Sequence, residues 1–229
     1  MYPFPQSQKI TLTKLIWNQI EKAFQSNPNL ASTIQGQRKI HQGCLGRRTA
    51  LFPSTKSAGA IPLESRLELA HAICLEQNIQ VKKFRTQALK IPLSGGNFCY
   101  PDFIVQNLDG SFEVHEVKPS RKALATEEIQ KFEHVSKILN QMGILFKLID
   151  QSDLPTTKQL QNLLYLYQRG HRKVWTALEV DLAIRTLKDT FFLDIEGVHT
   201  SLNKVGLACE LGDYLVFHKK IKINSIGEI

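Results

Sequence analysis

Two acidic residues and a lysine stand at a spacing that suits the cleavage of phosphodiester bonds. Asp102 follows a proline, and the segment Glu116-Val117-Lys118 comes one turn later in the chain. Two carboxylates that share a divalent cation can polarise a phosphate, lower the pKa of a water molecule and steady the leaving oxygen. A neighbouring lysine can orient that water or offset the charge that builds on the phosphate. The spacing therefore predicts a metal-dependent nuclease site with Asp102, Glu116 and Lys118 as catalytic residues.

This site depends on a β-hairpin. Residues 100–106 and 111–118 are rich in β-branched and aromatic residues, and a polar turn separates them. A three-residue loop that ends at Gly110 in the left-handed conformation is a favoured hairpin connection. In that register Asp102 lies opposite Glu116, and the lysine two residues further projects from the same face. His115 then points to the opposite face and is not expected to be catalytic.

Carboxylate oxygens with open coordination positions suit Mg²⁺, for which Mn²⁺ can substitute, better than zinc. Two facing carboxylates also repel each other unless a cation lies between them or one of them takes up a proton. The alternative interpretation is a surface hairpin whose acids and lysine form ordinary solvated pairs.

The elements around the hairpin indicate a mixed α/β (α+β) fold. An amphipathic helix is expected over residues 63–75, beginning at Pro62, and a strand that contains Gln87 over 81–91. A second helix (126–142) and a buried strand (144–149) follow the hairpin. A mixed sheet flanked by helices is the natural packing of this series. Glu64 and Glu68 would share one face of the first helix.

This order of elements, with an acid on the first helix and the Asp … Glu-x-Lys hairpin in the middle, resembles the restriction-endonuclease-like PD-(D/E)xK nucleases. Pro62-Leu63-Glu64-Ser65, Tyr100-Pro101-Asp102-Phe103 and Glu116-Val117-Lys118-Pro119 look more narrowly like the TnsA-type endonucleases of heteromeric cut-and-paste transposons. The resemblance covers about residues 60–150.

The resemblance implies that Glu64, Asp102 and Glu116 bind the metal and that Lys118 is the catalytic lysine. Glu68 is the rival of Glu64, and Gln87 is a second-line candidate. The resemblance further implies cleavage of double-stranded DNA at the 5′ ends of a mobile element. A DDE-type transposase would join the 3′ ends, and an ATP-dependent regulator protein would license both reactions.

The chain has 229 residues and a net charge of +8, and almost all of the excess lies in residues 1–60, with eight Lys or Arg against one Glu. The glycine-punctuated middle of this segment suits an arm along a DNA backbone, and a solvated leader is the alternative. The residues expected to contact DNA are Arg38, Lys39, Arg47 and Arg48, with Arg121 and Lys122 beside the hairpin.

No apolar run approaches the length of a membrane span, and the four cysteines form no Cys-x-x-Cys pair. A cytoplasmic protein that associates with the nucleoid when it acts is expected.

Three domains are expected: a basic DNA-contacting segment (1–60), the catalytic core (61–152) and a small C-terminal domain (153–229). In the last domain, helices are predicted at 158–168, 176–188 and 197–208, and a strand at 214–223. These elements suggest a winged-helix-like module. Because its net charge is weak, partner binding is favoured over DNA binding. Two other functions stay open for the whole chain: a stand-alone restriction or repair nuclease, and a non-catalytic DNA- or partner-binding module.

Overall fold

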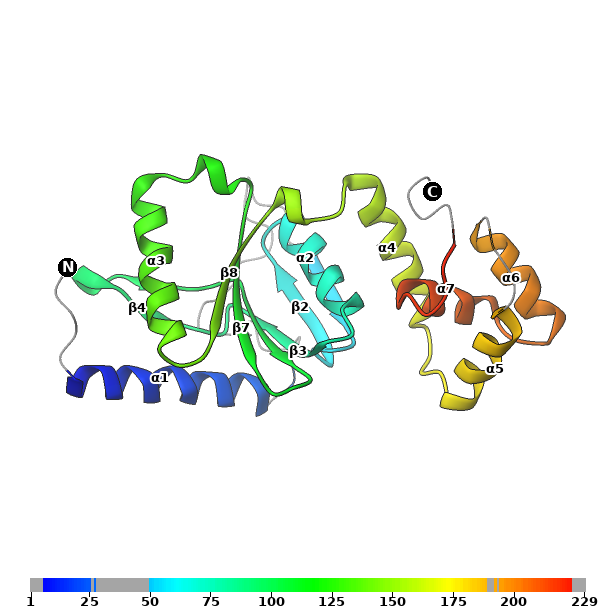
Figure 1. The fold of residues 1–229 in the computed structure, drawn as a ribbon, viewed down its shortest axis with the longest axis horizontal. Coiled ribbons are helices and arrows are strands. Elements are labelled where there is room, and N and C mark those ends of the chain that lie inside the picture. The colour runs from blue at the N-terminus through cyan, green and yellow to red at the C-terminus, as the bar shows by residue number, and fades with distance from the viewer. Residues whose placement is uncertain (1–5, 26, 28–49, 189–191, 193, 224–229) are drawn as a thin grey trace. The chain divides into compact units, whose positions relative to one another are not determined.

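The computed structural model describes residues 6–25, 27, 50–188, 192 and 194–223 (Figure 1). The chain forms two compact units. The first comprises residues up to 76 together with 80–154, and the second comprises 77–79 and the residues from 155 onward. Seven α-helices and a mixed sheet make the described chain a mixed α/β protein. In this described part, no helix is both long enough and apolar enough to cross a membrane.

A four-stranded sheet is the centre of the first unit, in the order β3-β6-β7-β8, with β7 and β8 parallel and the other pairs antiparallel. The unit's elements are α1 (Gln6–Gln25), β1 (Ala50–Ser54), β2 (Gly59–Leu63), α2 (Arg66–Gln77), β3 (Val81–Thr86), β4 (Ile91–Pro92), β5 (Phe98–Cys99), β6 (Phe103–Asn107), β7 (Phe112–Lys118), α3 (Thr126–Asn140) and β8 (Leu145–Asp150).

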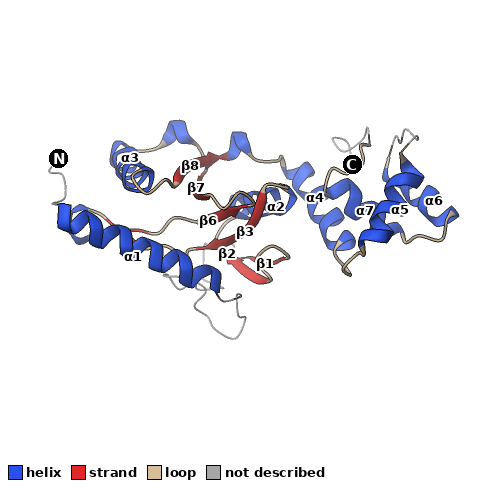
Figure 2. Ribbon diagram, turned by 60° about the horizontal axis from the view of Figure 1, so that its bottom comes forward, coloured by secondary structure: helices blue, strands red, loops and turns tan. Residues whose placement is uncertain are grey.

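Helices cover both faces of this sheet, with α2 on one side and α1 and α3 on the other (Figure 2). On the α1 and α3 side, Ile16 and Ile20 of α1 and Leu139 of α3 join Ile104 of β6 and Val114 of β7 in one buried cluster. On the α2 side, His71 packs edge-on against Phe103.

The predicted hairpin register is confirmed. Phe103 pairs with His115 and Gln106 with Phe112, and the N–H of Asn107 donates to the carbonyl of Ser111. Gly110 adopts a φ of 85°, which supplies the left-handed turn residue.

Three sequence predictions about this unit are wrong in detail. Pro62 does not begin a helix but lies in β2, which pairs with β1, so that α2 begins only at Arg66. The strand predicted over 81–91 is interrupted after Thr86 because Gln87 has a φ of 51°. The last strand is not buried: β8 forms the edge of the sheet, and Leu145 is 49% exposed.

The segment expected as a basic arm is folded at both ends. The α1 helix and the β1–β2 hairpin lie in the first unit, where the guanidinium of Arg85 on β3 donates to the carbonyls of Ala23 and Ser57. Arg38, Lys39, Arg47 and Arg48 lie outside the described residues.

The second unit contains four helices, namely α4 (Thr157–Gly170), α5 (Ala177–Leu187), α6 (Ile195–Lys204) and α7 (Cys209–Phe217). The strand predicted over 214–223 is wrong, because residues 209–217 are helical. Leu211 and Leu215, one helical turn apart, are fully buried, so tertiary packing overrides the β-branched and aromatic composition. Within residues 155–188, 192 and 194–223, β structure is limited to one bridge between Phe192 and Ile223. The expected wing is therefore not formed by these residues.

Candidate active site

The candidate site forms where β6 begins and β7 ends. The pairing of these strands, continued by one residue, sets Asp102 beside Glu116, as the hairpin register requires. Glu116 is buried, and its Oε1 lies 3.1 Å from Nζ of Lys118. Asp102 Oδ2 accepts a hydrogen bond of 2.8 Å from the N–H of Val117. The structure thus brings together the three residues of the predicted hairpin site.

Gln87 lies directly against Asp102. Its amide Nε2 donates to Asp102 Oδ1 at 3.1 Å, and its backbone N–H donates to the Asp102 carbonyl at 3.0 Å. The side chain is only 2% exposed. The left-handed backbone conformation of Gln87 costs a non-glycine residue roughly 1–2 kcal/mol, and such strain is found at functional sites. A residue that sequence analysis ranked as second-line therefore contacts the central carboxylate.

The carboxylates lie in surroundings that oppose their ionisation. Burial, the Glu116 carboxylate and Glu68 together raise the pKa of Asp102 to about 8, and burial also raises the pKa of Glu116. Burial alone would lower the pKa of Lys118, but its ion pair with Glu116 and the nearby Asp102 and Glu128 raise it above the ordinary value. Lys118 is therefore an ammonium group at neutral pH, suited to stabilising anionic charge and not to accepting a proton.

The structure places the two candidate acids at the start of α2 in different surroundings. Glu64 precedes α2, and its backbone N–H donates to Oε2 of Glu68 at 2.9 Å. Ser65 caps the helix, since its hydroxyl accepts the N–H of Glu68 at 3.1 Å. Glu68 is buried and contributes to the raised pKa of Asp102, whereas Glu64 is partly exposed. Of the two, Glu68 is thus the acid whose negative charge acts on Asp102.

The expected set Glu64, Asp102 and Glu116 is not assembled as a group of metal ligands. Across the described residues, no three His, Cys, Asp or Glu side chains lie close enough to hold a metal ion by themselves. Two oxygen atoms at the site nevertheless suit a cation: Oε2 of Glu116 and Oε1 of Gln87 are buried and accept no hydrogen bond. A carboxylate and an amide oxygen are ligands that Mg²⁺ and Mn²⁺ accept, so the residues present fit such an ion.

Helix α3 adds two charged residues that the sequence analysis missed. Oε1 of Glu128 lies 3.9 Å from Nζ of Lys118. The positive charge of Lys131 partly offsets the rise that burial causes in the pKa of Glu116. The sequence did contain a signal for these two residues. They are three apart, so they share one face of the first α-helix after the predicted site.

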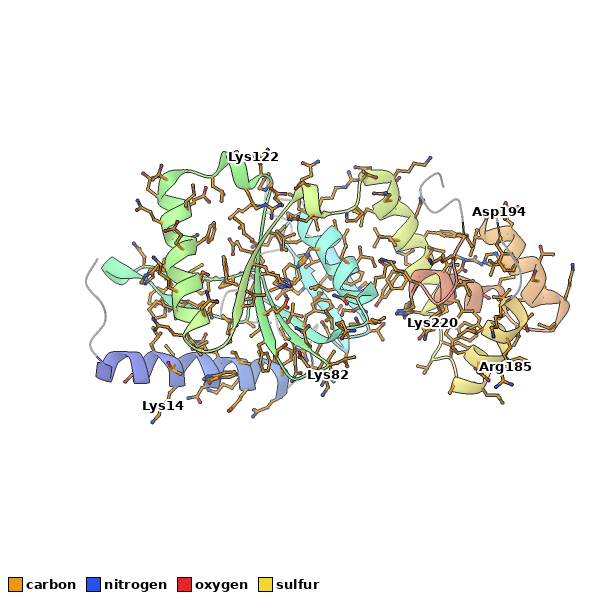
Figure 3. The ribbon with its side chains drawn as sticks, viewed as in Figure 1. Lys14, Lys82, Lys122, Arg185, Asp194 and Lys220 are labelled. Atoms are coloured by element: carbon orange, nitrogen blue, oxygen red, sulfur yellow. The ribbon has the colours of Figure 1, made fainter. Side chains whose placement is uncertain are left out.

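The two basic residues beyond β7 differ in their surroundings. Arg121 forms ion pairs of 3.1 Å with Asp150 and with Asp153, so its guanidinium ties the chain after β7 to the end of β8. Lys122 is exposed at the turn between β7 and α3 (Figure 3). Arg121 therefore has a structural role, and contact of Lys122 with DNA stays a prediction.

A chain of hydrogen bonds runs along the opposite face of β7. Nζ of Lys147 lies 2.6 Å from Oε2 of Glu113, which lies 2.9 Å from Nε2 of His115. Nδ1 of His115 lies 2.9 Å from Nε2 of His71 on α2. Burial lowers the pKa of His115 and, with the neighbouring charges, that of His71 to about 3, so both rings are neutral at pH 7. His115 therefore connects α2 to the sheet and faces away from the carboxylates, as strand alternation predicts.

The chain matches no model of a known protein family, and a search of curated proteins gives no significant match.

Proposed function

We propose that this protein is a Mg²⁺-dependent DNA endonuclease whose site consists of Asp102, Glu116 and Lys118, with Glu68 as the acid contributed by α2. The observation that supports this best is the Asp102–Glu116 pair, in which Glu116 is buried and Asp102 is half-buried, with Lys118 only 3.1 Å from Glu116. Two facing carboxylates withdrawn from solvent are costly without a cation, so such a pair at one end of a hairpin is a good candidate for a functional site.

The metal would be held by Asp102 and Glu116 and, when bound, would supply Lewis-acid activation of the phosphate and of the attacking water. Asp102 is fixed for this task by the Val117 N–H and by Gln87. The Lys118 ammonium would donate to the phosphate oxygens as negative charge builds on them. Exposed Lys122 and the basic residues Arg38, Lys39, Arg47 and Arg48 would hold the DNA backbone.

The finer assignment rests on the TnsA-like motifs. It makes the first unit a restriction-endonuclease-like domain and the second a small helical partner-binding domain. The protein would cut the 5′ ends of a mobile element together with a DDE-type transposase and an ATP-dependent regulator. Its place of action would be the cytoplasm, at the nucleoid.

The test is nicking of supercoiled plasmid by the purified protein in Mg²⁺ or Mn²⁺, alone and with the co-expressed transposase and regulator. Lys118→Ala should reduce cleavage by about 10²–10³-fold, because one group that stabilises transition-state charge is removed. Lys82→Ala is the matched control, since Lys82 is an exposed lysine on β3 (Figure 3).

Cleavage at 5′ ends only with the partners, lost in Lys118→Ala, would support the transposon role. Cleavage by the chain alone would favour a self-sufficient restriction or repair nuclease with the same site. Absence of cleavage under all these conditions, with DNA binding retained, would point instead to a non-catalytic binding module.

A further inference from the structure

Gln87 has one feature that the carboxylate site does not explain. Its Oε1 is buried and accepts no hydrogen bond, although its Nε2 is bound to Asp102 Oδ1. An amide oxygen can accept two hydrogen bonds or coordinate a cation, and leaving it buried without either is unfavourable. A ligand that binds to this oxygen would remove that energetic cost.

The orientation of this amide follows from Asp102. With a cation bound, Asp102 is ionised and only accepts hydrogen bonds, so the NH₂ of Gln87 must then face Oδ1. Since Oε1 and Nε2 are bonded to the same carbon, Oε1 then also lies near Asp102. The second buried oxygen without a hydrogen bond, Oε2 of Glu116, belongs to that same pair.

The backbone supports the same conclusion. Gln87 interrupts the strand after Thr86 with a φ of 51°, and its N–H is held by the Asp102 carbonyl at 3.0 Å. A positive φ costs conformational free energy for glutamine but not for glycine. Such a residue is expected where its side chain has a function.

Resting on the nuclease function proposed above, we propose that Gln87 is a third protein ligand of the divalent cation, through its amide oxygen. In this arrangement one neutral oxygen joins the two carboxylates of Asp102 and Glu116. The neutral ligand adds a coordination bond without adding another negative charge to the site.

The experiment measures Mn²⁺ binding to the full chain, by electron paramagnetic resonance of free Mn²⁺, for the wild type and two variants. Gln87→Gly removes the ligand and relieves the positive φ, so the protein should stay folded while Mn²⁺ affinity falls by at least about tenfold. Gln87→Glu replaces the amide by a carboxylate and should bind Mn²⁺ at least as tightly as the wild type. Without metal it should melt at a lower temperature, because it adds a further acidic group to the buried site.

Ala58→Gly is the matched control, because Ala58 also has a positive φ, 55°, in the loop between β1 and β2. It should leave Mn²⁺ affinity unchanged. Unchanged affinity in Gln87→Gly, or affinity in Gln87→Glu as weak as in Gln87→Gly, would show that Gln87 only positions Asp102 and would overturn the inference.

Plasmid cleavage by the same preparations separates the two proposals. A wild type that binds Mn²⁺ in a Gln87-dependent manner but never cleaves DNA would leave the ligand assignment standing and refute the nuclease function. If the wild type cleaves DNA and the Gln87→Gly variant binds Mn²⁺ normally, the nuclease function stands and the ligand assignment is refuted. A wild type that binds no Mn²⁺ would refute both.

Discussion

At the scale of single residues, Asp102 makes the stability of the protein depend on pH, because its carboxyl group is protonated in the folded protein over a wide pH range. Its pKa is about 8 in the folded state, against an ordinary value near 3.8. The folded state therefore binds a proton that the unfolded chain releases between these values. The stability due to that proton is fully present below about pH 4 and is lost as the pH rises towards 8.

We predict that, without metal, raising the pH from about 5 to 8 lowers the melting temperature of Asp102→Asn less than that of the wild type, because the amide does not titrate. Differential scanning fluorimetry measures the difference, with Glu127→Gln on the exposed side of α3 as control. Parallel curves for wild type and Asp102→Asn would contradict the raised pKa.

Added Mg²⁺ should raise the melting temperature of the wild type more at about pH 8.5 than at pH 6, since the ion competes with a proton for the carboxylates. Asp102→Asn should lose most of this response. An equal metal-induced shift at both pH values would argue against coordination by Asp102.

At the scale of elements, the start of α2 controls the position of Glu68. We predict that Ser65→Ala destabilises the first unit by about 1 kcal/mol, because the hydroxyl that accepts the Glu68 N–H is lost. Ser65→Asn keeps a capping oxygen and should stay close to the wild type. Urea unfolding of the three proteins gives the comparison, and equal destabilisation by both substitutions would rule out the cap as the cause.

The hairpin and the two helices before and after it could be predicted from the sequence because their signals are local. The turn that ends at Gly110 fixes the register, and the register brings Asp102 to Glu116. By contrast, Pro62 forms part of a strand because of its pairing partner Leu51, which no local pattern in residues 62–75 reveals. The same limit made Glu68 only the second choice after Glu64, because its position depends on where α2 begins.

Gln87 and α7 show two further limits. The positive φ of Gln87 arises from hydrogen bonds to Asp102, fifteen residues later, and not from its own preference. Residues 214–223 have the composition of a strand, yet packing of α7 against α4 and α6 makes the residues up to Phe217 helical. Gly212, for example, lies so near Val198 that an added Cβ would come within 2.9 Å of its Cγ1.

At the scale of the whole molecule, the division into two units predicts that damage to one can be confined to it. A Cβ on Gly170 would lie 2.7 Å from the backbone of Tyr214, which cannot move without displacing α7. We predict that Gly170→Ala destabilises the second unit by about 1–3 kcal/mol. Hydrogen exchange should then quicken in residues 155–223 and stay unchanged in β6 and β7.

Gly197→Ala is the control for this prediction, because its Cβ would meet the Phe192 side chain at 3.3 Å, and a side chain can adjust. It should be close to neutral. Faster exchange in β6 and β7 of Gly170→Ala would show that the two units unfold together.

The packing of α1 into the buried cluster of the first unit has a consequence for synthesis on the ribosome. Ile16 and Ile20 share that cluster with residues that are translated much later, from Ala88 to Ile144. Until β6, β7 and α3 have emerged, the apolar side of α1 lacks most of its native neighbours and is open to chaperones or to other nascent chains. The helix closest to the start of the described chain is therefore among the last parts of the first unit to reach its final place.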